Sequence, residues 1–400
     1  MKYCGNCGKP QDDDALFCAD CGQRLTDVIM EKRRQERRGE ETVEEEEEET
    51  AEKKSQSGWV DDLGSYMGHK GKAELNWSAL FSNVFESHTH EEAESIFICG
   101  TEKTTPAESD VKRDWPRPWL YSRVLVMMLL AYLLLWLCCE GFSNLNALPG
   151  LIVVGSFAVP LATLVLFLEV NAWRNVSVYE VLQVFLVGGC LSMVATLTLF
   201  SIYPVEELDY WGALMVGLIE EFGKAIVAYI FLRRLCKLSV LTGMLIGAAV
   251  GAGFAAFESA GYAMKPILAY LPYIGYAAAQ GEEIGMESVL EMTYEIIRLR
   301  GFLAPGGHVA WAAISGAGIV MAAKANKEIS FSLLLSGKFW RLFIIPVLLH
   351  AAWDCPLASE IGASIYLVPI LLLVAVWVVV MILINMGLVE LPGSSNHNTQ

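Results

Sequence analysis

SVLTGMLIGAAVGAGFAAFESAGYAM, residues 239–264, is the stretch of sequence that decides the fold class. It exceeds the roughly 20 apolar residues that an α-helix needs to cross the hydrocarbon core of a bilayer. Gly243, Gly247 and Gly251 recur at every fourth position, so one face of this helix can approach a neighbouring helix closely. Glu258 follows on the same helix, where a carboxylate is costly and requires an explanation. We expect a membrane helix that packs closely against a neighbour and carries a polar group.

Long apolar stretches follow one another through the chain from Trp119 onward. Hydrophobic residues make up 54% of the 400 residues and charged residues only 18%, which excludes a soluble enzyme. We therefore predict an all-α polytopic membrane protein with about eight transmembrane helices and the lipid bilayer as its surroundings. The predicted spans are 119–139, 147–168, 179–200, 211–231, 239–264, 302–323, 338–354 and 361–387, with one long outside loop at 265–301.

Positive charges occupy alternate connections between these spans. Lysine and arginine occur before the first span, at Arg174, within 233–237 and within 324–338. The short loops 140–146, 201–210 and 355–360 contain neither residue type. The positive-inside rule therefore predicts that both termini face the cytoplasm.

The N-terminal part of the chain is polar and acidic. Residues 1–112 contain 14 lysines and arginines against 26 aspartates and glutamates, so they offer no basic surface and nucleic acid is not an expected partner. Six consecutive acids, Glu44 to Glu49, repel one another and bury no core. The predicted organisation is a zinc ribbon at 1–25, a disordered acidic linker at 26–73, a cytoplasmic segment with an amphipathic helix at 74–114, a membrane domain at 115–390 and a tail at 391–400.

Two C-x2-C pairs stand at the beginning of the chain, Cys4 with Cys7 and Cys18 with Cys21. Four thiolates in two close pairs suit a closed tetrahedral Zn²⁺ site, and the metal supplies folding energy that about 25 residues lack. The alternative is a pair of disulfides, which an oxidising compartment would favour. We expect a structural zinc ribbon, because a four-cysteine site leaves no open position for chemistry.

Ionisable residues gather in four consecutive spans. The fourth holds Glu220, Glu221 and Lys224; Glu220 can pair with Lys224 one turn away, which leaves Glu221 for another partner. The fifth holds Glu258 and Tyr262. The sixth opens with PGGH at 305–308, and the seventh contains HAAWD at 350–354. In the seventh, a carboxylate one turn from the imidazole can select its tautomer.

Two interpretations of these residues stay open. Each pair, Glu220 with Lys224 or His350 with Asp354, can be a buried contact that only holds helices together. Together, in the outer half of the bilayer, they can instead form a water-filled acid and base pocket. Clusters in four consecutive spans, against three spans with none, favour the pocket.

The order of the motifs EExxK, FExxxY, PxxH and HxxWD on successive helices resembles the PrsW family of intramembrane proteases, distant relatives of the type II CAAX-processing proteases. The resemblance covers about residues 115 to 390, and the zinc ribbon resembles a domain appended to some members. It implies an endopeptidase of the bacterial cytoplasmic membrane that cleaves a membrane-anchored protein, such as an anti-sigma factor, near the outer face. The functional residues that it implies are Glu220, Glu221, Glu258, His308 and His350, supported by Lys224, Tyr262 and Asp354.

For the chemistry we assign Glu221 as the base, and His308 or His350 as a metal ligand or as the oxyanion stabiliser. A Zn²⁺ held by glutamate and histidine can activate water, or these residues can act without metal; HExxH is absent, and we favour the metal-free version. Two other classes of function compete. A proton- or ion-coupled transporter also places such residues inside spans, and a pseudoprotease scaffold would bind helices without cutting them.

Overall fold

The structure is a computed structural model that describes residues 2–4, 6–12, 15–22, 58–235, 237–280, 286–326, 329–360 and 366–391. The chain divides into two compact units, Met1–Lys72 and Ala73–Gln400. Most of the predicted linker and all but the first residue of the predicted tail lie outside the described residues.

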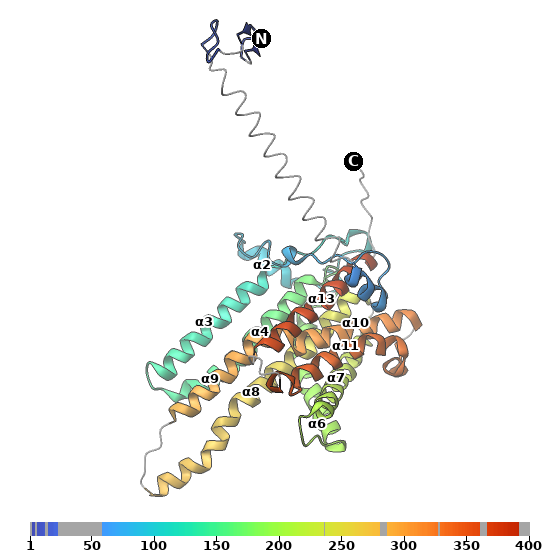
Figure 1. The fold of residues 1–400 in the computed structure, drawn as a ribbon. Coiled ribbons are helices and arrows are strands. Elements are labelled where there is room, and N and C mark those ends of the chain that lie inside the picture. Colours follow the sequence, from blue (N-terminus) through green and yellow to red (C-terminus); the bar gives the residue numbers. More distant parts are fainter. Residues whose placement is uncertain are drawn as a thin grey trace. The chain divides into compact units, whose positions relative to one another are not determined.

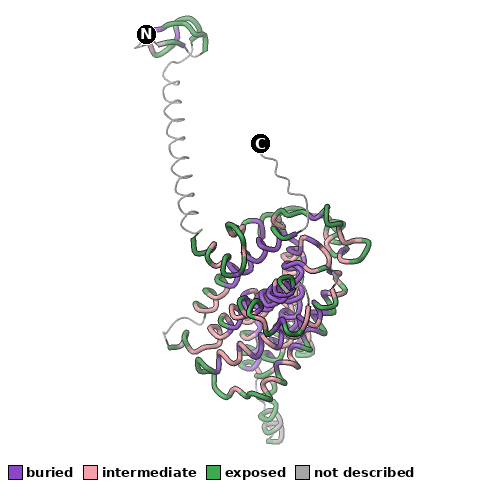
Figure 2. The backbone as a smooth tube through the Cα atoms, turned by 90° about the vertical axis from the view of Figure 1, so that its right-hand side faces the viewer, coloured by how far each residue is buried: buried purple, intermediate pink, exposed green. Residues whose placement is uncertain are grey.

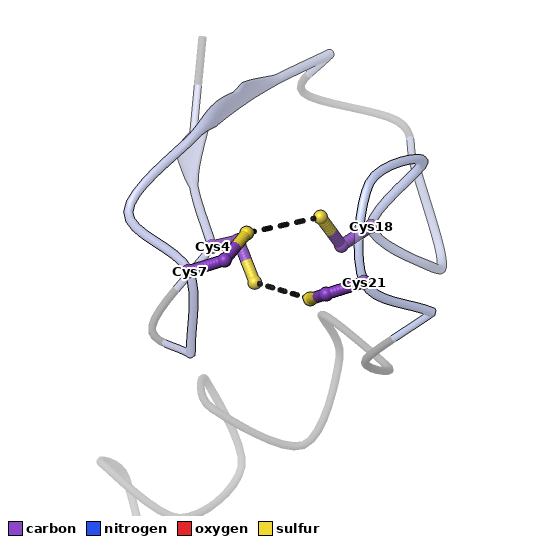
Figure 3. A group of neighbouring side chains, drawn as sticks. All are labelled: Cys4, Cys7, Cys18 and Cys21. Atoms are coloured by element: carbon purple, nitrogen blue, oxygen red, sulfur yellow. Dashed lines mark hydrogen bonds between the residues drawn. The ribbon is translucent and has the colours of Figure 1, made fainter.

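The N-terminal unit contains a two-stranded antiparallel sheet and four clustered cysteines. Strands β1 (Lys2–Tyr3) and β2 (Pro10–Gln11) pair. Figure 3 shows the four sulfurs facing one another, with Cys4 Sγ 3.5 Å from Cys21 Sγ and Cys7 Sγ 3.6 Å from Cys18 Sγ. The backbone N–H groups of Cys7 and Asn6 hold the pKa of the Cys4 thiol at about 7, below its usual value. The cluster therefore can hold a zinc ion, as the cysteine spacing predicts.

A glycine directly follows each cysteine pair and allows the backbone to turn there. Gly8 and Gly22 have φ angles of +73° and +72°, which a residue with a Cβ rarely adopts. Their N–H groups donate to the carbonyl oxygens of Cys4 and Cys18, at 2.8 and 2.9 Å. The turn thus brings the second cysteine of each pair close to the first. Further along this unit, residues 58–67, which the sequence assigns to the linker, form a helix.

The second unit is helical. Its elements in chain order are η1 (Trp77–Leu80), α2 (His90–Phe97), η2 (Glu108–Asp110), α3 (Leu120–Glu140), η3 (Leu145–Ala147), α4 (Leu148–Val170), α5 (Val178–Gln183), η4 (Val184–Gly188, a π-helical turn), α6 (Gly189–Ile202), α7 (Tyr210–Leu232), α8 (Val240–Gln280), α9 (Glu287–Leu303), η5 (Ala304–Gly306), α10 (His308–Asn326), η6 (Phe331–Leu335), α11 (Gly337–Asp354), α12 (Leu357–Glu360) and α13 (Leu367–Glu390). Figure 1 shows α4, α7, α8, α10, α11 and α13 side by side as a bundle.

Six helical stretches among the described residues are long and apolar enough to cross a membrane: Leu120–Glu140, Leu145–Val170, Val178–Ile202, Val240–Tyr273, Glu287–Ala325 and Leu367–Glu390. The sequence predicts eight spans, and the remaining two coincide with α7 and α11. These two differ from the six in their charge. Helix α7 carries Glu220, Glu221 and Lys224, and α11 carries Lys338, Arg341 and Asp354. Length and composition alone therefore identify six spans.

The segment predicted as a long outside loop, 265–301, is mostly helical. Helix α8 is 41 residues long and extends to Gln280, and α9 packs against it. At 1.5 Å per residue α8 is about 60 Å long, twice the thickness of a hydrocarbon core. Pro266 and Pro272 lie inside α8, so neither proline ends this helix where the sequence analysis ended the span.

Glycines hold α8 directly against α10. A Cβ atom on Gly247 would lie 2.0 Å from the carbonyl oxygen of Ala312, and one on Gly251 would lie 2.2 Å from that of His308. Only glycine permits such backbone contact, so the predicted close-packing face is confirmed. The contact places the start of α10 beside Gly251, in the first third of α8.

Burial differs sharply between helices. Of the apolar window in α8, 94% is buried, whereas in α3 the share is 6%. Figure 2 shows the buried residues along the middle of the bundle formed by Ala73–Gln400. The exposed apolar side of α3 suits contact with hydrocarbon, because α3 packs mainly on α4.

Within 74–100 the sequence predicts one amphipathic helix around Trp77 to Phe85. The structure has a short 3₁₀ helix at Trp77–Leu80 and an α-helix at His90–Phe97. A capping box starts the latter, because Glu92 N–H donates to Thr89 Oγ1 and Thr89 N–H donates to Glu92 Oε2, at 3.2 and 2.8 Å.

Replacing Cys4 and Cys7 together by serine should remove about one zinc per full-length chain, because two of four thiolate ligands are lost. The N-terminal unit should lose its fold while the helical unit keeps its helical circular dichroism. Metal analysis of the purified protein checks this result. The control is Cys190→Ser on α6, which should retain the zinc; equal zinc content in both variants would contradict the site.

Gly247→Leu should destabilise the helical unit by more than the roughly 1–3 kcal/mol typical of overpacking, because its side chain meets backbone rather than a movable side chain. Gly261→Leu on the same helix is the matched control, since nothing lies within 4 Å of its Cβ position. Thermal unfolding in detergent compares the two. Similar melting temperatures for both variants would show that the α8 and α10 backbones are not in contact.

Candidate active site

A cavity of about 820 Å³ opens among the α6–α7 connection, α7, α8, the α9–α10 connection and α11. Six of the eight predicted site residues in the membrane line this cavity: Glu220, Glu258, Tyr262, His308, His350 and Asp354. The other two, Glu221 and Lys224, are fully buried and do not line it. The structure therefore brings the predicted residues together in two layers. The six that line the cavity form the cavity layer, and Glu221 and Lys224 form the buried layer.

Lys224 is the centre of the buried layer. Its Nζ donates to Glu221 Oε1 at 2.7 Å and to His308 Nδ1 at 2.8 Å, and it lies 3.6 Å from Glu220 Oε2. The ring of Phe254 covers it, with its centroid 4.3 Å away. The predicted pairing of Glu220 with Lys224 is present, but the shorter contact is with Glu221.

His350 connects the two layers. Its Nδ1 lies 2.9 Å from Glu221 Oε1, and its Nε2 lies 3.3 Å from Asp354 Oδ2 and 3.8 Å from Glu220 Oε2. Gly217 makes this reach possible, because a Cβ there would lie 2.9 Å from the carbonyl oxygen of Val347 on α11. The absence of a side chain lets α11 approach α7.

His308 is the first residue of α10, where α10 leaves the short η5 turn. Its Nε2 lies 3.0 Å from Glu258 Oε2, and its Nδ1 lies 4.0 Å from Glu220 Oε2. Trp311, one turn later, stacks on the imidazole of His350 with ring centroids 4.5 Å apart. The two imidazoles are themselves 5.1 Å apart between centroids.

Glu220, His308 and His350 fit a metal ion. One ligand atom from each lies within 4.8 Å of the others, and Glu220 Oε2 is buried without a hydrogen-bond partner. Each imidazole uses its other nitrogen on a carboxylate, Glu258 for His308 and Glu221 for His350. Metal-binding histidines characteristically have such partners, which fix the tautomer and orient the other nitrogen for the metal. In His308 that other nitrogen, Nδ1, accepts from Lys224 Nζ at 2.8 Å, so a metal bound there would replace this hydrogen bond. Two imidazoles and a carboxylate are ligands that Zn²⁺ takes in catalytic sites.

The sequence analysis missed three residues of this site. Arg300, on α9, lines the cavity and pairs with Glu258; it fell in the predicted outside loop. Ser259 accepts from Arg300, and Trp311 covers His350. An arginine eight residues before the histidine of PGGH was the signal available for Arg300.

Comparison of the sequence with known proteins identifies the family to which the chain belongs. The sequence profile of PrsW family intramembrane metalloproteases matches residues 177–384, slightly more than half of the chain. This range contains Glu220, Glu221, Glu258, His308 and His350. No curated protein matches the chain, and no solved structure matches it either.

The matched range runs from α5 into α13, so it includes every helix that contributes to the cavity. The family description names a metal, and the buried cluster of one carboxylate and two imidazoles is chemically suited to hold one. The order of motifs and the match agree on the same family. The chain belongs to the PrsW family of intramembrane metalloproteases and is a multi-pass membrane peptidase.

Proposed function

We propose that the chain is a zinc-dependent endopeptidase that cleaves membrane-anchored regulatory proteins, anti-sigma factors among them, near the outer face of a bacterial cytoplasmic membrane. The observation that carries this proposal is the convergence of Glu220, His308 and His350 at a cavity, with the second nitrogen of each imidazole held by a carboxylate. The family description replaces our preference for a metal-free mechanism, because it names a metalloprotease.

In this proposal Glu220, His308 and His350 hold the metal. When bound there, Zn²⁺ would acidify a water molecule and polarise the carbonyl of the scissile peptide. Glu258 and Glu221 orient the imidazoles by accepting their N–H protons. Lys224 balances the negative charge of the two glutamates next to it on α7.

The base assigned from the sequence, Glu221, is in the buried layer and has no surface on the cavity. Asp354 is better placed to take the proton of the attacking water. Its side chain is 25% exposed, the largest share among the carboxylates around His350, and it lines the cavity. A carboxylate in that position can also return the proton to the leaving amine.

The topology that we propose retains all eight spans, with α7 and α11 as membrane helices stabilised by their mutual charge pairs. Lys324 pairs with Glu390 at 2.8 Å at one end of the bundle, the end that the positive-inside rule assigns to the cytoplasm. His308, at the opposite end of α10, is then nearer the outer face. The protease domain proposed is 115–390, and the zinc ribbon at 1–25 is an accessory domain.

Glu220→Gln should lower the metal content of the full-length protein from about two zinc ions per chain to about one, because it removes a ligand of the membrane site and leaves the ribbon. Cleavage of a co-reconstituted single-span reporter should be lost with the metal, because the metal activates the water. Metal analysis and the cleavage assay are read on the same samples. Glu287→Gln, an exposed glutamate at the start of α9, is the control; unchanged zinc content in Glu220→Gln would refute the ligand set.

Glu221→Gln should destabilise the protein more than Glu220→Gln, because it leaves the fully buried ammonium of Lys224 without its nearest carboxylate. Breaking a buried ion pair costs about 3–5 kcal/mol. The double variant Glu221→Gln with Lys224→Met should recover stability, since both charges are removed. Thermal unfolding in detergent gives the order, and a larger loss in Glu220→Gln would show that Glu220 is the principal partner of Lys224.

Asp354→Asn should reduce kcat by the roughly 10²- to 10⁴-fold associated with loss of a general base, with metal content unchanged. The amide keeps the size and polarity of the side chain but accepts no proton. Kinetics of reporter cleavage in lipid vesicles measure the change. Near-normal kcat would assign the base to another carboxylate at the cavity, with Glu258→Gln as the next variant.

A further inference from the structure

Arg300 stands out among the residues of the cavity because three residues of α8 hold it. Its guanidinium pairs with Glu258 Oε2, its Nε donates to Ser259 Oγ at 2.9 Å, and its Cζ lies over the ring of Tyr262, 4.4 Å from the centroid. The side chain is 27% exposed. The ion pair, the hydrogen bond and the ring contact each restrict the orientation of the guanidinium.

The partner of Arg300 is also the partner of His308. Glu258 Oε2 accepts from Arg300 and lies 3.0 Å from His308 Nε2. A carboxylate oxygen that is already bonded to a guanidinium is held charged and in one rotamer. The imidazole then donates its Nε2 proton to a fixed acceptor, which leaves Nδ1 without a proton. Nδ1 accepts from Lys224 Nζ at 2.8 Å and lies 4.0 Å from Glu220 Oε2.

Arg300 also lies at the point where the chain enters the site. Only Gly301 to Gly307 separate it from His308, and Gly306 packs so closely on Leu373 of α13 that a Cβ would lie 2.7 Å from the Leu373 Cβ. The connection between α9 and α10 is therefore held at one end by the contacts of Arg300 with α8 and in its middle by the contact of Gly306 with α13. Loss of the Arg300 contacts would free the segment that precedes His308.

We infer that Arg300 is a positioning residue of the metal site: through Glu258 it sets the tautomer and orientation of His308 for metal binding. This inference rests on the proposed function, since it concerns the same three ligands. Arg300 does not touch the metal ligands Glu220 and His350 in this arrangement; it acts through Glu258. No other arginine or lysine among the described residues pairs with Glu258 at salt-bridge distance.

A rival role follows from the same position. Because Arg300 lines the cavity, its guanidinium can bind a carbonyl or carboxylate of the substrate instead. The two roles differ in what they change. A residue that positions His308 alters metal affinity in the absence of substrate, whereas a substrate-binding residue alters KM and leaves metal affinity unchanged.

The experiment uses full-length protein in which Cys4, Cys7, Cys18 and Cys21 are all serine, so that the membrane site is the one whose metal affinity is measured. Zn²⁺ affinity is determined by competition with a chromophoric chelator, without substrate. The variants are Arg300→Gln, Arg300→Lys and Ser259→Ala. Arg298→Gln is the matched control, because this arginine is on the same helix with an exposed side chain that does not line the cavity.

Arg300→Gln should weaken Zn²⁺ binding by roughly 10- to 100-fold, the usual effect of losing a partner behind a ligand, and lower kcat with little change in KM. Arg300→Lys should recover part of the affinity, because an ammonium still pairs with Glu258 but lacks the planar fork that also reaches Ser259. Ser259→Ala should lower the Zn²⁺ affinity a few-fold. This variant tests the inference if Arg300→Gln fails to fold. Arg298→Gln should bind Zn²⁺ like the parent.

Unchanged Zn²⁺ affinity in both Arg300→Gln and Ser259→Ala would overturn the inference, as would a raised KM with unchanged affinity, which would make Arg300 a substrate-binding residue. Failure of the proposed function has a separate signature. In that case the protein with the four cysteines replaced would bind no Zn²⁺ at the membrane site. Glu220→Gln would then leave its Zn²⁺ binding unchanged, whichever residue occupies position 300.

Discussion

The buried ammonium of Lys224 is the interaction on which the rest of the site depends. A charge without exposed surface in the interior of a membrane protein is tolerated only when other groups compensate it. Glu221 lies on the same helix, one turn away, and His308 comes from α10. Glu221 in turn bonds His350 of α11. Neutralising one lysine therefore requires α7, α10 and α11 to meet at one depth.

Glycines make this convergence sterically possible. Gly247 and Gly251 bring α8 onto α10, and Gly217 brings α11 onto α7. These contacts set Glu258 beside His308 and Glu221 beside His350. Each imidazole is thereby oriented by a carboxylate on another helix. The remaining nitrogen of His350 lies 3.8 Å from Glu220 Oε2, and that of His308 lies 4.0 Å from it and accepts from Lys224. Helix packing and the proposed metal chemistry therefore depend on the same small residues.

Much of this arrangement could be predicted from the sequence, because charged groups and glycines at regular spacing inside apolar stretches have few explanations. The motif residues and their convergence follow from that argument. The choice between Glu220 and Glu221 as partner of Lys224 does not, since residues three and four apart both lie one turn away. In the structure Glu221 lies in the buried layer, where it contacts His350 and Lys224, whereas Glu220 lines the cavity.

The extent of α8 and the role of Arg300 were out of reach for a related reason. Hydropathy ends a span where polar residues begin, but α8 continues past Lys265 because α9 packs along it. A segment assigned to a loop offers no reason to examine its arginines. The tertiary contact between α8 and α9 is what makes Arg300 part of the site.

The central claim is that two imidazoles and one carboxylate inside the membrane hold the catalytic metal. X-ray absorption at the zinc edge, on active full-length protein with all four ribbon cysteines replaced by serine, tests it most directly. The account predicts about one zinc per chain with nitrogen and oxygen ligands at about 2.0–2.2 Å, two of them imidazoles, and no sulfur. Active protein without bound zinc, or zinc whose ligands include no imidazole, would contradict the account.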